Sequence, residues 1–342
     1  MAKKNRWRKY FFLTGMLTVA LSVFGFLRLR DFGQTPLQLP ATAMVTVAKG
    51  DGLNRVLPKL RASGIMQGWD WQWKVLALKM DMAGRIHVGD YEFTNGITPA
   101  GVLAMLASGD TARVKYTLVE GRSFRQMRAE LAALSELEDD LAGKSDADIM
   151  TLLERKGMHP EGRFLPDTYF VPKSGKRSDL LRQAAEAMDV ALAASWNGRD
   201  SGLPMKTPDE LLTLASIVEK ETGKASDRRM IASVFHNRLR VGMPLQTDPT
   251  VIYGMGDAFD GNLRRRDLQT DHAWNTYTRK GLPPTPIAMP GKAALKAALE
   301  PAKSNALYFV AKGDGSSYFS LSLNEHNQAV NRYQRGLSKE GQ

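Results

Sequence analysis

The sequence contains no cysteine, which excludes disulfides, thiolate nucleophiles and zinc sites built on thiolates. Its five histidines never take a metal-ligand spacing such as HExxH, so no metal site is expected. The GxSxG elbow of serine hydrolases, the P-loop and the dinucleotide glycine pattern are also missing. We therefore expect no cofactor. Carboxylate, amide and hydroxyl side chains are left to carry any chemistry.

Acidic residues are missing from the first 30 positions, which carry seven lysine and arginine side chains. Seven of the eleven net positive charges lie there, so the other 312 residues carry only +4. A nearly balanced surface of this kind does not indicate nucleic-acid binding. The apolar content of 43% is that of a globular protein with a sizeable core, and the length suggests two domains beyond any anchor.

Charged residues are also missing from the 18 positions 10–27. As a helix this run would be about 27 Å long, close to the hydrocarbon thickness of a bilayer. Five lysines and arginines precede it and two follow, so the positive-inside rule predicts a cytoplasmic N-terminus. A signal peptide cleaved at 41–43 is the alternative, but that site lies far beyond a long apolar run. We expect a single-pass anchor in the cell inner membrane, with residues 31–342 in the periplasm.

Residues 31–43, with Pro36 and Pro40, predict a linker. Residues 44–110 then predict strands at 44–47 and 89–93 with two helices between them and a short helix after them. This β-α-α-β order resembles the small LysM module, which binds N-acetylglucosamine polymers. Trp69, Trp71 and Trp73 could stack on sugars, but core positions are favoured for them.

Residues 111–335 predict a larger mixed domain, followed by a tail at 336–342, so the expected fold class is α+β. The acid-rich residues 136–150 predict a solvated excursion. Ser226 is expected to cap one helix of this domain, and His326 to begin its last one.

The most informative stretch is 207–223. Thr207 and Glu210 predict a capping box, Pro208 suits the first helical position, and Gly223 supplies a stop. One apolar stripe runs along this helix: Leu211, Leu212, Leu214, Ala215, Ile217 and Val218.

Glu219 and Glu221 lie in the last turn of this helix, where the macrodipole favours cations. Partial burial there should raise a carboxyl pKa, as a general acid near neutral pH requires. The two side chains point roughly 200° apart, and Glu221 lies slightly nearer the apolar stripe. Solvated helix-end acids are the alternative. Protonation of a leaving oxygen by such an acid is the glycosidase requirement.

Six motifs then occur in order: EGRFLPDTY (161–169), ASIVEKET (215–222), VFHNRL (234–239), LQTDPTVIYGMG (245–256), NTY (275–277) and GLPPTPI (281–287). Together they resemble the endolytic murein transglycosylases, the MltG/YceG-like family, over residues 44–335. The resemblance implies a membrane-anchored peptidoglycan lytic transglycosylase. Such an enzyme cleaves the MurNAc–GlcNAc β-1,4 bond within a strand without water, forms 1,6-anhydroMurNAc ends, and would limit or terminate strand elongation.

The resemblance assigns catalysis to Glu221, the second glutamate of the EKE motif, and Thr222 then matches the Glu-Ser pair of other lytic transglycosylases. One departure is GLPPTPIAMPG, where the family more often has a glycine after the double proline. Peptidoglycan glycan strands are the expected partner, with peptidoglycan synthases of the same membrane as further candidates. The resemblance also implies these substrate-binding positions: Glu161, Asp167, Tyr169, Gln246, Asp248, Asn275 and Tyr277.

Three rival functions remain open on the sequence. A hydrolytic muramidase would need a second carboxylate roughly 5–9 Å away, from Glu161, Asp167 or Asp248. A non-catalytic glycan-binding anchor protein would keep the aromatic residues and not need Glu221. A membrane scaffold for wall synthases would need neither.

Overall fold

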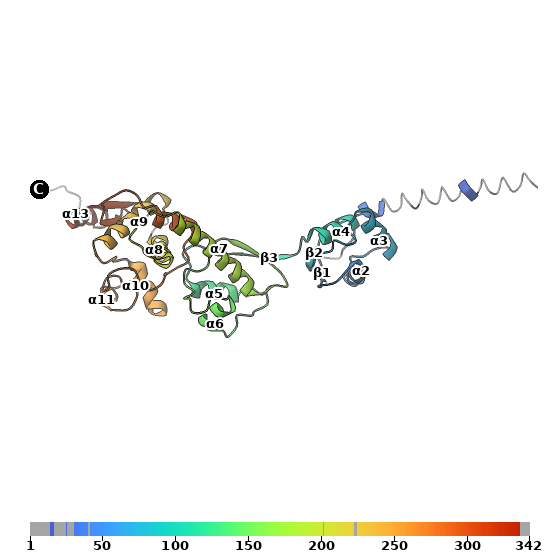
Figure 1. The fold of residues 1–342 in the computed structure, drawn as a ribbon, viewed down its shortest axis with the longest axis horizontal. Coiled ribbons are helices and arrows are strands. Elements are labelled where there is room, and N and C mark those ends of the chain that lie inside the picture. Colours follow the sequence, from blue (N-terminus) through green and yellow to red (C-terminus); the bar gives the residue numbers. More distant parts are fainter. Residues whose placement is uncertain are drawn as a thin grey trace, which may run out of the picture. The chain divides into compact units, whose positions relative to one another are not determined.

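The computed structural model describes residues 31–39, 42–200, 202–221 and 224–335, together with residues 14–16 and 25. These residues divide into two compact units (Figure 1). The first runs up to Val114 and includes Pro172–Gly175; the second holds Lys115–Val171 and the residues from Lys176 onwards. The division falls inside β3 (Arg113–Thr117) and β4 (Thr168–Pro172), which pair with each other. Helices and two-stranded sheets mix along the chain, which confirms the α+β prediction.

The first unit contains β1 (Ala43–Val47), α2 (Leu53–Ala62), α3 (Asp70–Lys79) and β2 (Gly89–Phe93), in the β-α-α-β order that the sequence predicts. The two strands pair antiparallel, with Val45 opposite Tyr91. α4 (Pro99–Ser108) follows; Thr98 caps it and Gly109 ends it with a φ of 72°. The largest fully buried side chains of this unit are Trp73, Tyr91, Phe93, Leu57, Leu60, Ile65, Leu103 and Leu106.

The prediction of a linker is wrong for residues 31–39. Leu37 and Leu39 are only 3% and 6% exposed and belong to the core of the first unit. The Leu37 amide donates to the Ile97 carbonyl at 2.8 Å. Two prolines in a short stretch suggested a linker, but the leucines beside them bury against the unit. The first unit therefore includes residues 31–39.

The second unit carries most of the helices. Its elements are α5 (Phe124–Ala132), α6 (Asp146–Leu152), α7 (Arg177–Asn197), α8 (Pro208–Glu221), α9 (Ala225–Arg240), α10 (Asp248–Met255), η1 (Gly256–Ala258), α11 (Arg265–Gln269), α12 (Lys292–Leu299), β5 (Tyr308–Ala311), β6 (Ser317–Ser320) and α13 (Leu323–Tyr333). β5 and β6 form an antiparallel hairpin with Phe309 opposite Phe319.

The central helix α8 packs against α7, α9, α10 and α12. All eight residues from Leu211 to Val218 are buried, so the prediction of a single apolar stripe was too narrow. Thr213 and Ser216 can be buried because their hydroxyls donate to carbonyls of the preceding turn, at 2.8 and 2.7 Å. Helices therefore cover α8 along these eight residues, up to the turn that carries Glu219 and Glu221.

The capping box at the start of α8 is half as predicted. Thr207 Oγ1 accepts from the Glu210 amide at 3.2 Å. The Glu210 carboxylate, however, accepts from the Lys206 amide, one residue earlier than the predicted partner.

Three local predictions in the second unit are corrected. Residues 136–150 are not a solvated excursion, because Ile149 and Met150 are buried and Asp146 pairs with Arg128. Ser226 lies inside α9, one residue after its first position. α13 begins three residues before His326 and is capped by Ser322.

No described helix is long and apolar enough to cross a membrane. The predicted anchor at 10–27 lies outside the described residues apart from 14–16 and 25. The tail at 336–342 and the stop at 223 also lie outside them.

Candidate active site

Glu221 is the last residue of α8 and is half-buried. Burial is the largest cause that raises the pKa of its carboxyl, to about 7, and the negative charge of Asp248 raises it further. A hydrogen bond from Thr247 and the charge of Arg238 act in the opposite direction. This carboxyl can therefore hold or release a proton near neutral pH.

Thr247 holds the Glu221 carboxylate. It precedes α10 in the capping position, yet its side chain does not cap that helix. Its hydroxyl donates instead to Glu221 Oε1. The Thr247 amide donates to Thr276 Oγ1 at 3.2 Å, and Thr250 Oγ1 donates to the Thr247 carbonyl at 2.7 Å. Thr247 was not among the predicted site residues, although Thr-Asp-Pro at a helix start marks a hydroxyl at that position.

Asp248 and Tyr277 lie in the same group as Glu221. The Tyr277 hydroxyl donates to Asp248 Oδ1 at 2.5 Å. The pKa of Tyr277 is raised by burial, by Asp248 and by the charge of Glu221. Gln246 is exposed beside them with a φ of 48°, and its amide donates to the Thr276 carbonyl at 3.1 Å. The structure thus brings four predicted residues, Glu221, Gln246, Asp248 and Tyr277, to one place.

Arg238 supplies a buried positive charge that the sequence reasoning missed. It lies on α9 and is 6% exposed. Its guanidinium donates to the carbonyls of Leu307 and Leu245, at 2.7 and 2.6 Å. Burial lowers the pKa of Arg238, and its charge lowers that of Glu221. Arg238 therefore holds the backbone at Leu245, two residues before Thr247. Its positive charge favours the ionised form of Glu221.

Glu219 has a structural partner and a buried position. Its side chain is 7% exposed and accepts from the Gly291 amide at 2.9 Å, immediately before α12. Arg228 lies 3.9 Å from its other oxygen. Burial raises the pKa of Glu219 as well. The alternative of two solvated helix-end acids is therefore wrong. Glu219 accepts a hydrogen bond from a backbone amide, whereas Glu221 accepts one from the Thr247 hydroxyl.

Asn275, predicted as a substrate-binding residue, makes contacts to the backbone of its own loop. It is fully buried, and its amide nitrogen donates to the carbonyls of Leu268 and Thr270 at 3.1 and 2.7 Å. Its oxygen accepts from the Tyr277 amide at 2.8 Å. Asn275 therefore shapes the loop that presents Tyr277.

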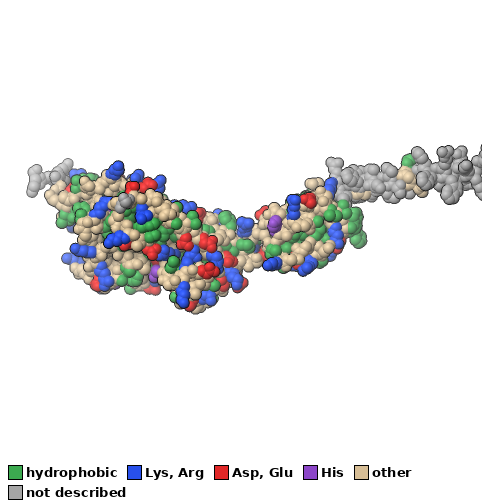
Figure 2. All heavy atoms as spheres, viewed as in Figure 1, with side chains coloured by type: hydrophobic (Ala, Val, Ile, Leu, Met, Phe, Trp, Pro, Cys, Tyr) green, Lys and Arg blue, Asp and Glu red, His purple; other side chains and the backbone are tan. Residues whose placement is uncertain are grey.

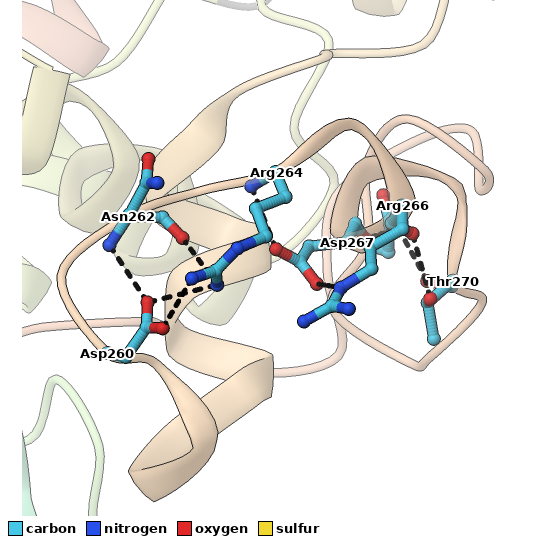
Figure 3. A network of polar contacts seen from close by, with 7 residues as sticks. Asp260, Asn262, Arg264, Arg266, Asp267 and Thr270 are labelled. Atoms are coloured by element: carbon cyan, nitrogen blue, oxygen red, sulfur yellow. Dashed lines mark hydrogen bonds and ion pairs between the residues drawn. The ribbon is translucent and has the colours of Figure 1, made fainter.

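A polar network shapes the neighbouring part of this loop (Figure 3). Arg264 Nη2 donates to Asp260 at 2.7 Å, and the Arg264 amide donates to Asp267 at 2.8 Å. Thr270 Oγ1 donates to the Arg266 carbonyl at 2.9 Å at the end of α11. The carbonyls that Asn275 binds are thus themselves held in place.

The remaining predicted residues lie outside the Glu221 group. Glu161 is 2% exposed and accepts from the Phe124 amide at 3.0 Å, at the start of α5. Burial raises its pKa to about 7, and Tyr253 is its side-chain partner. Tyr169 is buried and donates to the Leu165 carbonyl at 2.6 Å. Asp167 is exposed and lies 3.5 Å from the Lys292 amine. In the structure Glu161 and Tyr169 shape the 161–169 loop.

Comparison with known proteins gives a consistent result. A family model described as the YceG-like family matches residues 45–332. An endolytic murein transglycosylase from Bacillus subtilis is 30% identical over 311 residues, 85% of each chain. A second, from Streptococcus pneumoniae, is 31% identical over 60% of this chain and 40% of its own. The crystal structure of a yceG-like protein from Listeria monocytogenes aligns with a TM-score of 0.52 and 28% identity, over 84% of this chain and 98% of that one.

Proposed function

The chain belongs to the YceG-like family, and from that premise we propose that it is an endolytic murein transglycosylase with Glu221 as its catalytic acid and base. The environment of the Glu221 carboxyl carries the assignment. Burial raises the pKa of this carboxyl to about 7, and its Oε1 accepts a hydrogen bond from the Thr247 hydroxyl. A carboxyl with this pKa can serve in both protonation states within one turnover.

The proposed reaction needs one carboxyl. Protonated Glu221 gives its proton to the bridging oxygen as the bond from MurNAc C1 to the GlcNAc oxygen breaks. Ionised Glu221 then takes the proton of the MurNAc 6-hydroxyl, whose oxygen bonds to C1. The products are a new GlcNAc end and a 1,6-anhydroMurNAc end, and Glu221 is protonated again. No water enters, so no second carboxylate has to activate one.

The neighbours of Glu221 support these two steps. The Thr247 hydroxyl and the Arg238 charge stabilise the carboxylate that forms after the first proton transfer. Asp248 is the nearby carboxylate that the hydrolytic alternative would use, but it accepts a hydrogen bond from Tyr277. In the proposed reaction Asp248, Tyr277 and the exposed Gln246 bind sugar hydroxyl and amide groups.

We also propose that residues 10–27 anchor the chain in the cell inner membrane, with both units in the periplasm, where murein lies. The uncharged run and its flanking lysines and arginines support this arrangement. Cleavage of strands next to the membrane would limit or terminate their elongation. A reporter fused after Gln342 that is active only in the cytoplasm should give no signal, and activity there would overturn the orientation.

Mass spectrometry of the products from purified murein tests the reaction. We expect 1,6-anhydroMurNAc ends, formed internally along the strand, from the wild-type protein. Glu221→Gln keeps the side-chain volume but cannot exchange a proton, so turnover should fall by a factor on the order of 10² or more.

Glu219→Gln is the matched control, because glutamine can still accept from the Gly291 amide, and it should retain most of the activity. Products that end in reducing MurNAc would support the hydrolytic muramidase instead. Equal activity of the Glu221→Gln variant and the wild type would support a binding or scaffold role.

A further inference from the structure

Helix α3 has apolar side chains on two opposite faces. Trp73 and Leu76 point into the core and are 0% and 6% exposed. Trp71, Val75 and Leu78 point outward and are 54%, 39% and 70% exposed. A helix that is apolar on both sides is normally covered on both. Among the described residues nothing covers the outer side, which we call the outer face of α3, made of Trp71, Val75 and Leu78.

The outer face has the composition of a helix that lies in a membrane interface. At about 100° per residue, its three side chains fall within about 60° of one another. Lys74 flanks them on one side and Lys79 on the other, both exposed. Trp69, 71% exposed, stands just before the helix. Tryptophan with aliphatic side chains between lysines is the pattern of interfacial helices.

α3 is also packed against the residues that follow the uncharged run. Phe32 meets the Trp73 ring edge-on, with centroids 5.7 Å apart. Gly33 lies so close to Leu76 that an added Cβ would be 3.0 Å from Cδ1. Residues 31–39 are part of the folded unit, so only residues 28–30 separate it from the uncharged run. Four peptide steps reach at most about 14 Å.

We infer that the outer face of α3 docks on the phospholipid interface of the membrane in which the chain is anchored. The inference rests on the anchoring part of the proposed function. With a connection of at most about 14 Å and a headgroup layer about 5–8 Å deep, the first unit has to start at the membrane surface. Figure 2 shows hydrophobic side chains gathered at the end of the first unit where Figure 1 places α3.

Docking would fix the orientation of the first unit on the bilayer. Burial of the outer face in the interface removes apolar area from water, and the two lysines contact the phosphates of anionic lipids. A unit that contacts the membrane through both an anchor and a helix face does not rotate freely. Trp69 and Trp71 are then bound to lipid and are not available to stack on glycan.

The absence of cysteine allows a direct test, since any introduced cysteine is the single labelling site of the full chain. The variants Val75→Cys and Leu78→Cys carry a nitroxide on the outer face. Val190→Cys and Leu321→Cys are the controls, because these side chains, 71% and 62% exposed, replace the same residue types on the second unit. Each labelled chain is placed in nanodiscs of phosphatidylethanolamine and phosphatidylglycerol. Collision rates with oxygen and with a water-soluble nickel complex are then measured.

At positions 75 and 78 we expect the collision rate with oxygen to exceed that with the nickel complex several-fold, because oxygen concentrates in the bilayer. At positions 190 and 321 we expect the collision rate with the nickel complex to be the higher one. Equal access of the nickel complex to all four labels, with the chain retained in the discs, would overturn docking and leave anchoring intact. Loss of the chain from the discs would overturn anchoring itself. Shielding of 75 and 78 from both reagents would show a protein partner instead. Shielding only after addition of N-acetylglucosamine oligomers would show a glycan site.

Discussion

The hydrogen bond from the Thr247 hydroxyl to Glu221 limits how far burial raises the pKa of the proposed acid. Burial raises the pKa of Glu221 to about 7, and this hydrogen bond lowers it, because it stabilises the carboxylate. Only the protonated form can start cleavage, so activity should fall as the pH rises through the pKa of Glu221.

The substitution Thr247→Val removes the hydroxyl and keeps the branched shape. The pKa of Glu221 should then rise, and the fall in activity should move to higher pH. The measurement is the pH profile of 1,6-anhydro end formation from purified murein. Thr247→Ser keeps the hydroxyl and should retain the wild-type profile. An unchanged profile in the valine variant would show that Thr247 only supports the loop.

Glu161 shows how burial of a carboxyl couples stability to pH. Its pKa is raised from the ordinary 4.5 to about 7, so the folded chain keeps a proton that the unfolded chain loses above about pH 4.5. The free energy of unfolding should therefore fall as the pH rises from 4.5 to about 7. The contribution of this single group is at most about 3 kcal/mol at 1.36 kcal/mol per pH unit.

Glu161→Gln is uncharged at every pH and can still accept from the Phe124 amide. We expect it to flatten the loss of stability in that pH window. Urea unfolding at a series of pH values measures the effect. Because the pKa of Glu221 is raised too, Glu221→Gln should remove the part of the pH-dependent stability loss that Glu221 causes. The double variant should remove the contributions of both glutamates. A slope unchanged by Glu161→Gln would mean that Glu161 is ionised when folded.

At the scale of elements, the loop between α10 and α12 brings Tyr277 to the Glu221 group with little regular structure, since α11 is its one α-helix among the described residues. Its shape depends on Asn275, which ties three carbonyls and the Tyr277 amide together. The network around Arg264 holds the start of α11 in the same loop (Figure 3). Side-chain hydrogen bonds to backbone replace the ladder of a helix or sheet here.

Asn275→Ala should lower the free energy of unfolding by about 1–3 kcal/mol, since it leaves buried carbonyls without a donor. Activity should fall as well, because Tyr277 loses its support. Thermal unfolding and proteolysis within residues 260–280 measure the structural part. Asn262→Ala, an exposed asparagine of the same loop, is the control. Loss of activity at unchanged stability would mean that Asn275 contacts the substrate.

At the scale of the whole molecule, residues 31–39 belong to the folded first unit. Phe32, Leu37 and Leu39 complete the core of the first unit, although the sequence suggested a linker there. The Glu221 group lies entirely in the second unit. In the proposed function, residues 10–27 anchor the chain, and the chemistry belongs to the second unit.

Two shortened chains test whether residues 31–39 stabilise the first unit. Removal of residues 1–30 should leave the first unit folded, whereas removal of residues 1–41 strips Leu37 and Leu39 from its core. Burial of two leucines contributes roughly 3–6 kcal/mol, so the shorter chain should unfold at markedly lower urea concentration. Hydrogen exchange of the amides in the paired strands β1 and β2 monitors the first unit. Both chains should still cleave murein in solution. Equal stability of the two would restore the linker interpretation.

The sequence by itself determined most of the elements of this protein. The two strands and two helices of residues 44–93, the short helix after them and the cap of α8 at Thr207 all follow from neighbours within a few residues. The same local signals could not show that α8 is covered on every side, or that residues 31–39 are folded. Those depend on which surfaces meet.

The tertiary structure decided how the site is built. The EKE motif points to Glu221, but its hydrogen-bond donor lies 26 residues further along the chain, at Thr247. Asn275 was expected to bind substrate and instead holds a loop, because its amide is surrounded by carbonyls. A side chain's chemistry is set by its type, but its partners are set by packing between distant segments. Local sequence patterns therefore identify which side chains can take part in the chemistry, and only the fold brings these side chains into contact.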